Sequence, residues 1–261
     1  MRFPHVVVMM DVDLFCLGEG KDMPVHDWTR VDAGTFHAFH NSWITHLMET
    51  FNGGLLPRGY YALSEQHAGL GIADVLALHV PDDPASEPRS QPGGVVLAEA
   101  PPRVRRRLVP EGHGAYRAAR KTLTIRHVSG HRVVALVEIA SPANKDRPRS
   151  VADFVTKIDE ALQRNCHVPL VDVLPPGPHD PRGLHGVLWD FYADDHYDLP
   201  ADEPLTLASY VAGSRLGPEA FVEHLAFGQP LPDMPLFLDP ERYVPVPLEA
   251  TYMAAFRGMP G

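Results

Sequence analysis

Residues 132–157, RVVALVEIASPANKDRPRSVADFVTK, carry the pattern that decides the fold. Residues 133–140 are apolar on both alternating faces, as in a central strand covered on both sides, with the exception of Glu138. An isolated buried carboxylate is costly, so Glu138 should be protonated, hydrogen-bonded, paired with a cation or bound to a metal. Glu138 is therefore the first candidate functional residue.

A turn and an amphipathic helix follow this strand. The segment 141–145 contains turn-forming residues that end the strand, and it places the amine of Lys145 close to Glu138. Apolar residues then recur at three- and four-residue spacing between residues 151 and 162. Lys157 lies at the border of that apolar face, so it can point back toward the end of the strand.

Composition and charge limit the class of protein. The chain has 261 residues, 44% hydrophobic content and a formal net charge of −10, which suits one large core with an appendage. The charge argues against a surface that attracts nucleic acid everywhere, but it allows a local basic cleft. The two cysteines, Cys16 and Cys166, are too few for a disulfide framework or a thiolate metal site. Since no apolar run is long enough to span a bilayer, we expect a soluble, cytoplasmic protein with no membrane partner.

The N-terminal segment is expected to contribute little to the fold. Asp11 and Asp13 interrupt its short apolar stretch and no small-residue cleavage site follows, which argues against a signal peptide. Met23 begins MPVHDWTRVDAG, which is typical of a natural start. Residues 1–22 are therefore interpreted as a non-native or disordered extension.

Three further carboxylates lie in segments that favour strands. The predicted strand 61–67 carries Glu65, and the near-continuous apolar segment 72–78 follows Gly71 and carries Asp74. Asp74 can equally be a capped turn residue at the entrance of its strand. Residues 168–174 predict a strand parallel to the Glu138 strand, because a helix joins the two, and its Asp172 is interpreted as structural.

A helix is expected from Asp32 to about Gly53, with Thr35 as its N-cap. His37 and His40 on this helix have a spacing that could serve a metal ion. A third ligand at helical spacing is missing, so a structural role is the stronger interpretation.

Two regions lack regular periodicity. Residues 81–118 predict a long mobile insertion, and residues 122–128 a hairpin strand. Residues 177–261 are acidic and rich in proline, and they predict an irregular appendage with short helices at 184–192, 205–211, 218–225 and 248–256. The insertion carries a basic cluster that could contact a polyanion or remain a solvated loop. The cluster comprises Arg103, Arg105, Arg106 and Arg107.

The order of these elements resembles the PD-(D/E)XK phosphodiesterase core. This core is a restriction-endonuclease-like α/β fold with a mixed sheet flanked by helices, and the resemblance covers residues 23–176. More narrowly, VEIASPANK and VPLVDVL resemble a bacterial family catalogued as a domain of unknown function. That family is similar to the Uma-type sequences assigned as endonucleases.

The resemblance implies a metal site. Asp74 and Glu138 would hold Mg²⁺ or Mn²⁺, with Glu65 as a further ligand, and a lysine would orient the attacking water. The usual position of that lysine holds Ala140, so Lys157 or Lys145 must replace it. We favour Lys157, because a packed helix places an amine more accurately than a turn does.

The resulting hypothesis is a Mg²⁺-dependent nuclease that acts on DNA or RNA, with the basic cluster as a contact to nucleic acid and a homodimeric state left open. An alternative is a nuclease-like fold without catalysis that serves as a binding or assembly module. A small-molecule hydrolase that uses Ser141 or a histidine ranks last, because the sequence has neither a nucleophile elbow nor an ordered triad.

Overall fold

The computed structural model describes residues 25–64, 75–79, 104–108, 132–194, 197–213 and 217–259, with residues 75–79 and 132 described by their backbone alone. The helices are α1 (Ala33–Thr50), α2 (Pro142–Lys145), α3 (Pro148–Gln163), α4 (Gly183–Trp189) and α5 (Leu248–Phe256), with a 3₁₀ turn at Trp28–Arg30 and a π-helical turn at Phe51–Leu55. The strands are β1 (Tyr60–Leu63), β2 (Val75–His79), β3 (Arg106–Leu108), β4 (Arg132–Ile139), β5 (Val168–Asp172), β6 (Leu205–Val211), β7 (Glu219–Leu225), β8 (Met234–Phe237) and β9 (Tyr243–Val246).

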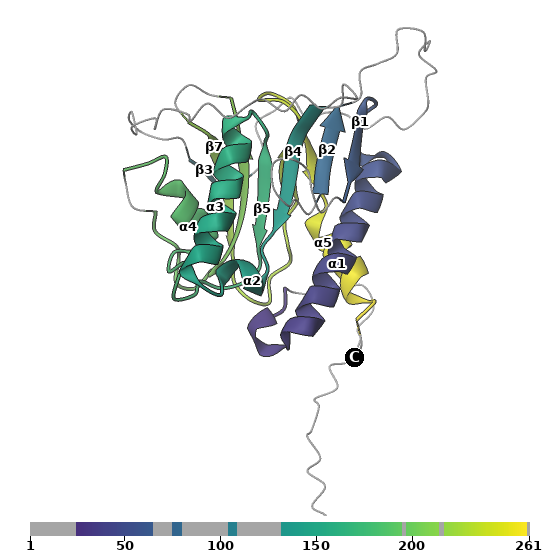
Figure 1. Ribbon diagram of the computed structural model, residues 1–261. Coiled ribbons are helices and arrows are strands. Elements are labelled where there is room, and N and C mark those ends of the chain that lie inside the picture. Colours follow the sequence, from purple (N-terminus) through teal and green to yellow (C-terminus); the bar gives the residue numbers. More distant parts are fainter. Residues whose placement is uncertain are drawn as a thin grey trace, which may run out of the picture.

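The protein is a mixed α/β structure. Over the described ranges, seven strands form one sheet in the order β1-β2-β4-β5-β6-β7-β3, and β8 and β9 form a separate two-stranded hairpin. Strands β4 and β5 pair in parallel, with Glu138 opposite Leu170, and the other neighbouring pairs are antiparallel. The parallel pair requires a crossover, which α3 provides in the expected βαβ arrangement (Figure 1).

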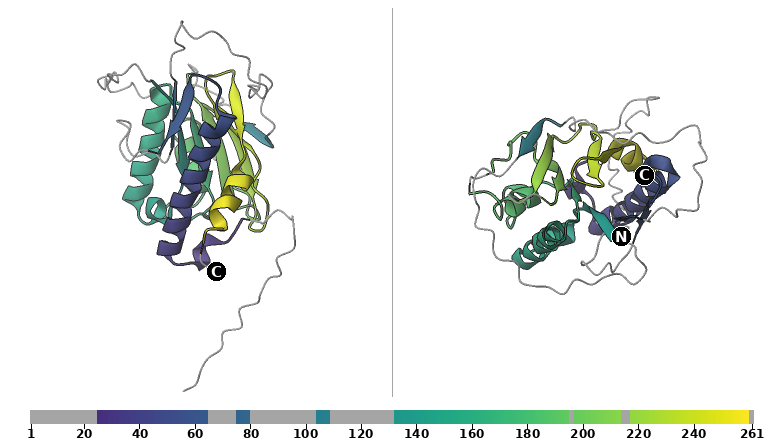
Figure 2. Two further views of the ribbon diagram at one scale, coloured as in Figure 1. Left: turned by 90° about the vertical axis from the view of Figure 1, so that its right-hand side faces the viewer. Right: turned by 90° about the horizontal axis from the view of Figure 1, so that it is seen from above.

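The two faces of the sheet are covered by different helices. Alternation along β4 and β5 sends Val137 and Val171 into a core with α1 and α5, and sends Leu136 and Leu170 into a core with α3 and α4. Figure 2 shows α3 and α4 lying apart from α1 and α5 when the molecule is seen from above. We call these the α1/α5 face and the α3/α4 face.

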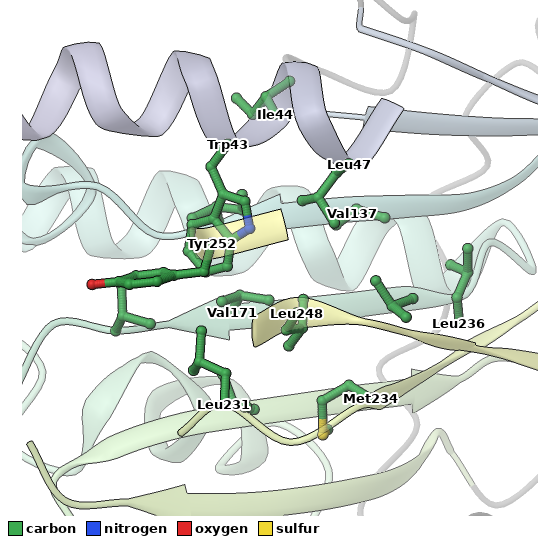
Figure 3. Packing of buried hydrophobic residues seen from close by; sticks show 14 of the residues in the cluster. Trp43, Ile44, Leu47, Val137, Val171, Leu231, Met234, Leu236, Leu248 and Tyr252 are labelled. Carbon is green, nitrogen blue, oxygen red and sulfur yellow. The ribbon is translucent and has the colours of Figure 1, made fainter. Parts of the chain in front are cut away.

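Aromatic side chains fill much of the α1/α5 face. The buried rings of α1 lie against Tyr252 of α5, and Trp43 contacts that ring edge-on (Figure 3). The Tyr252 hydroxyl accepts hydrogen bonds from Trp28 Nε1 and from the backbone N–H of His26, each at 3.1 Å. The segment before α1 is therefore fastened to the C-terminal helix, 224 to 226 residues further along the chain.

Helix α1 begins slightly earlier than the sequence suggested. Asp32, not Thr35, is the N-cap, and its Oδ1 accepts hydrogen bonds from the backbone N–H groups of Gly34 and Thr35. After the helix, the Asn52 side chain donates to the Ala62 carbonyl oxygen and accepts from the Ala62 N–H, both at 2.9 Å. This amide occupies hydrogen-bonding groups of β1, an edge strand of the sheet.

The prediction of an irregular appendage was wrong. Residues 205–211 and 219–225 are strands β6 and β7, not helices, and they extend the main sheet beyond β5. Both strands are almost entirely buried, and short segments of this kind do not separate helix from strand by periodicity alone. The helices predicted at 184–192 and 248–256 are confirmed as α4 and α5.

One part of the insertion also differs from the prediction. Residues 106–108 form β3, which pairs with β7 through Arg107 opposite Phe221. The described residues do not include the extension 1–22, Glu65, Asp74, residues 81–103 and 109–118 of the insertion, or the strand predicted at 122–128.

Candidate functional site

Glu138 lies near the end of β4 on the α3/α4 face, between Leu136 and Ala140. Its side chain is almost completely buried, with 1% of the residue surface exposed. The burial follows from the sequence, because β4 is apolar on both faces and a layer of side chains covers each face. A carboxylate in this position needs a cation or hydrogen-bond donors.

Lys157 supplies a cation. The apolar stripe of α3 is buried against the sheet and leaves Lys157 at its border, with 18% of the side chain exposed. Its Nζ lies 2.6 Å from Glu138 Oε2 and 5.0 Å from the centre of the Phe154 ring. The predicted direction of Lys157, toward the strand end, is confirmed, and its catalytic role stays a prediction. We call this contact the Glu138–Lys157 pair.

The other two predicted metal ligands are not among the residues that the structure describes. Asp74 and Glu65 lie outside the described residues, but the covalent neighbour of Asp74 is Val75, the first residue of β2. Val75 pairs with Val137, the residue before Glu138. The β2–β4 pairing therefore lies directly beside the Glu138–Lys157 pair.

Lys145 lies at a different place from the one predicted. It ends α2 and is buried, with its Nζ at 2.9 Å from Asp172 Oδ2, 2.9 Å from Asp180 Oδ2 and 3.0 Å from the Leu174 carbonyl oxygen. The expectation of a flexible turn was wrong, because the ammonium group is held by three acceptors from β5 and the segment that follows it. We call Lys145, Asp172 and Asp180 the Lys145 cluster.

The turn between Glu138 and Lys145 is held by its own side chains. Asn144 Oδ1 accepts hydrogen bonds from the Ser141 N–H at 2.8 Å and from the Ser141 hydroxyl at 2.7 Å. The bond from the Ser141 N–H is one half of a capping box at the start of α2, and in the other half the Ser141 side chain accepts from the Asn144 backbone N–H. These bonds engage Ser141 in the turn, which disfavours it as a hydrolytic nucleophile.

Asp172 has a more complex role than the structural one expected of it. Its Oδ1 accepts a hydrogen bond from the Leu174 N–H at 3.2 Å, as the structural interpretation requires, but it also pairs with Lys145. Complete burial raises the pKa of Asp172, and the ammonium group of Lys145 offsets this only in part. Sequence alone gave no sign of this pairing, because the partners are 27 residues apart.

A row of buried histidines and tyrosines continues across the α3/α4 face. His185 Nδ1 lies 2.5 Å from the Tyr210 hydroxyl, and the Tyr197 hydroxyl lies 2.7 Å from His224 Nε2. Burial lowers the pKa of His185 to about 3 and that of His224 to about 4, and it raises the pKa of both tyrosines. Both rings are therefore neutral at pH 7, and each can accept a hydrogen bond from a tyrosine hydroxyl. No motif in the sequence indicated this row.

Two described arginines of the basic cluster, Arg105 and Arg107, have acidic partners. Arg105 contacts Glu203 at 2.9 Å and Glu223 at 2.6 Å, and Arg107 contacts Glu219. Because both arginine side chains are more than half exposed, each pair contributes little to stability. A polyanion that binds here would have to compete with these carboxylates.

The histidines of α1 have structural contacts. His40 Nε2 donates a hydrogen bond to the Ile139 carbonyl oxygen at 3.0 Å, so α1 contacts β4 beside Glu138 from the opposite face. His37 is exposed and its Nε2 lies 3.1 Å from the Asn41 side-chain nitrogen. Within the described part of the chain, no three metal-binding side chains gather at one point.

Comparisons of the chain with protein-family models, with curated proteins and with solved structures found no match. Among the helices that the structure describes, none combines the length and the apolar character needed to cross a membrane. The site is therefore interpreted from its own geometry.

Proposed function

We propose that this protein is a metal-dependent phosphodiesterase of the PD-(D/E)XK type that cleaves nucleic acid. The observation that carries the proposal is the Glu138–Lys157 pair, which joins a carboxylate of a buried strand to a helix lysine at 2.6 Å. An acidic strand residue and a nearby lysine are two of the three elements that the resemblance requires.

The order and pairing of the elements support the same fold. Helix α1 is followed by β1, β2 and β4, which are neighbours in antiparallel pairing, and then by α3 and the parallel strand β5. The resemblance implies a helix, four strands, a helix and a strand, and β1, β2, β4, α3 and β5 match this order apart from the predicted hairpin strand, which lies outside the described residues. Strands β6 and β7 then extend the core.

The third element of the site would be Asp74. If the antiparallel register that joins Val75 to Val137 continued by one residue, positions 74 and 138 would face each other, and facing side chains project from the same side of a sheet. This register supports the assignment of Asp74 and Glu138 to one site, with Glu65 as a further ligand.

The chemistry of the donors fits the metal. Glu138 offers hard carboxylate oxygen, which Mg²⁺ and Mn²⁺ prefer, and a bound ion would polarise a phosphoryl oxygen. The Lys157 ammonium group would orient the attacking water and stabilise negative charge on the phosphoryl group. During hydrolysis a water oxygen bonds to phosphorus, the bond to the leaving oxygen breaks, and the leaving oxygen takes up a proton.

The nucleic-acid contact rests on the basic cluster. Arg103 lies outside the described residues, and Arg106 lies in β3 between Arg105 and Arg107. Contacts of arginines with phosphates would make substrate binding weaker as salt is raised.

One observation favours the non-catalytic alternative, in which the fold is a binding or assembly module. Lys157 already neutralises Glu138 by direct contact, as in a structural ion pair, and the usual position of the motif lysine holds the buried Ala140. In that case neither residue would need a metal ion.

The test is a cleavage assay of the purified full chain. Single- and double-stranded DNA and RNA would be incubated with Mg²⁺ or Mn²⁺, with metal omitted in parallel. We expect cleavage with metal, and a loss of about 10²-fold or more in Glu138→Gln and Lys157→Met. Arg149→Met is the matched control, since Arg149 is an exposed cation on the same helix.

Two outcomes would contradict the proposal or part of it. If the wild-type protein cleaves none of the substrates, the non-catalytic module replaces the nuclease. Cleavage that survives Lys157→Met, in a protein that is still folded, would remove Lys157 from the mechanism.

A further inference from the structure

We propose that the Lys145 cluster is a positioning device that sets the geometry of the Glu138–Lys157 pair, with Lys145 as a positioning residue and not a catalytic one. The inference rests on the proposed function, because it assigns a role to residues around that site. The three side chains are all buried, with 8% of the Lys145 side chain and at most 1% of each aspartate exposed.

The hydrogen-bonding capacity of Lys145 is fully used. An ammonium group has three N–H donors, and Nζ donates hydrogen bonds to both oxygens of the Asp172 carboxylate and to the Leu174 carbonyl oxygen. Asp180 Oδ2 lies 2.9 Å from Nζ as an ion-pair partner. No donor is left for a substrate or a water molecule. This geometry assigns Lys145 a role in holding two segments of the chain together.

The path of the chain explains what the cluster holds. Between Glu138 and Lys157 the chain leaves β4, passes through α2, where Lys145 is the last residue, and enters α3 at Pro148. Asp172 is the last residue of β5, the strand that pairs with β4. Lys145 thus ties the start of α3 to the end of the neighbouring strand.

Asp180 adds a second attachment. Its Oδ1 accepts a hydrogen bond from the Gly177 N–H at 2.8 Å, and its carbonyl oxygen accepts one from the Gly183 N–H at 2.8 Å, at the start of α4. The α2–α3 connection and the β5–α4 connection therefore meet at one ammonium group. A shift of either connection would displace α3 and with it Lys157.

The charges of the Lys145 cluster are consistent with a role in fixing the geometry of the Glu138–Lys157 pair. One cation faces two carboxylates in a buried setting, where an ion pair is strongly destabilised if one partner is removed. Replacing all three groups together by neutral side chains of similar size leaves no buried charge, so the fold can persist without the cluster. Positioning and folding can thus be separated by experiment.

The test compares Lys145→Met with the triple variant Lys145→Met/Asp172→Asn/Asp180→Asn. Arg182→Gln is the matched control, because it removes the ion pair of Arg182 with Asp190 beside the same connection but outside the cluster. Three quantities are measured on the full chain: melting temperature, kcat and KM for Mg²⁺-dependent cleavage, and the ¹⁵Nζ signal of Lys157. The chain has four lysines, so the signal can be assigned by substitution.

We expect Lys145→Met to lower the melting temperature, whereas the triple variant melts near the wild type. In the folded triple variant, kcat should fall by about 10²-fold while KM stays nearly unchanged, because a displacement of about 1 Å has this effect on turnover. The Lys157 signal should shift, and its protons should exchange faster with water. The control variant Arg182→Gln should keep the wild-type kcat and the wild-type Lys157 signal.

Each contrary result has a defined meaning. A folded triple variant with wild-type kcat and an unchanged Lys157 signal would overturn the inference and show a purely structural cluster. If the wild-type protein does not cleave nucleic acid, the proposed function fails, and the Lys157 signal alone decides whether the cluster positions the pair. Should the triple variant not fold, Lys145→Arg, which keeps the charge but changes its reach, must shift the Lys157 signal, or the inference is wrong.

Discussion

The two faces of the sheet are built from different kinds of side chain. On the α1/α5 face, α1 and α5 bury aromatic rings against valines and leucines of the strands, and their polar groups are chiefly the hydroxyl of Tyr252 and the indole nitrogens that bond to hydroxyls (Figure 3). The α3/α4 face instead buries ionisable groups: the Glu138–Lys157 pair, the Lys145 cluster and the row of histidines and tyrosines.

This difference indicates a division of labour. Apolar and aromatic burial stabilises a fold without setting exact positions for charges, whereas buried charges add little net stability and need well-defined partners. A protein that only had to fold would gain nothing from placing so many charged groups on one face. The α3/α4 face is therefore where we place the function.

The largest effect is expected from a cavity on the α1/α5 face. Trp43 is fully buried and donates a hydrogen bond from Nε1 to Thr251 Oγ1 at 3.0 Å. Trp43→Ala should lower the free energy of unfolding by about 3–5 kcal/mol, and Trp43→Phe by less. Chemical denaturation measures this change. If the comparison of the faces is right, the ¹⁵Nζ signal of Lys157 stays in place in the folded variant; a shifted signal would show that the faces are coupled.

A smaller effect is expected from the hydroxyl on the same face. Tyr252→Phe would leave Trp28 Nε1 without its acceptor in a buried position, at a cost of about 1–3 kcal/mol. A double-mutant cycle with Trp28→Phe would show whether the two losses share one interaction. Strictly additive losses would mean that the hydroxyl and the indole do not act together.

On the α3/α4 face we expect the free energy of unfolding to depend on pH, and its change per pH unit is the smallest of the three effects. His185 has a folded pKa of about 3 against an ordinary value of 6.5, so between these values the unfolded chain binds more protons than the folded one. Stability should therefore fall as the pH falls below about 6.5, by at most about 1.4 kcal/mol per pH unit for this one proton.

The substitution His185→Gln tests whether His185 causes this pH dependence. His185→Gln should flatten the dependence of the unfolding free energy on pH in that window, because the unfolded variant no longer takes up this proton. His37→Gln, on the exposed side of α1, is the control for the loss of any histidine. An equal slope in wild type and His185→Gln would show that the buried ring does not govern the acid response.

Sequence reasoning correctly predicted the elements whose local hydrophobic pattern matches their place in the folded chain. Strand β4, helix α3 and strand β5 were recognisable because a two-sided apolar strand, an amphipathic helix and a second apolar strand follow one another. The contact of Lys157 with the strand end followed from its place on the border of the helix face. Its partner Glu138 was visible as the one acidic residue in the strand.

The missed features depend on contacts between distant segments. Strands β6 and β7 were predicted as short helices, because LTLASYV and EAFVEHL are short segments whose secondary structure is decided by the strands beside them. The Lys145 cluster joins residues that are 27 and 35 positions apart, and nothing in the local sequence marks Asp180 as a partner. Likewise, β3 is ordered by pairing with β7 and has no periodicity of its own.

The bond between the start and the end of the fold has a consequence during protein synthesis. His26 and Trp28 are made early in synthesis, and Tyr252, whose hydroxyl bonds both of them, is translated 224 to 226 residues later. At roughly 5–20 residues per second, this leaves an interval of about 10–45 s in which the aromatic side of α1 has no partner from α5. The nascent chain should therefore expose an aggregation-prone aromatic surface while it is still on the ribosome. Slow elongation or a scarcity of chaperones should reduce the yield of folded protein, although neither destabilises the protein once it has folded.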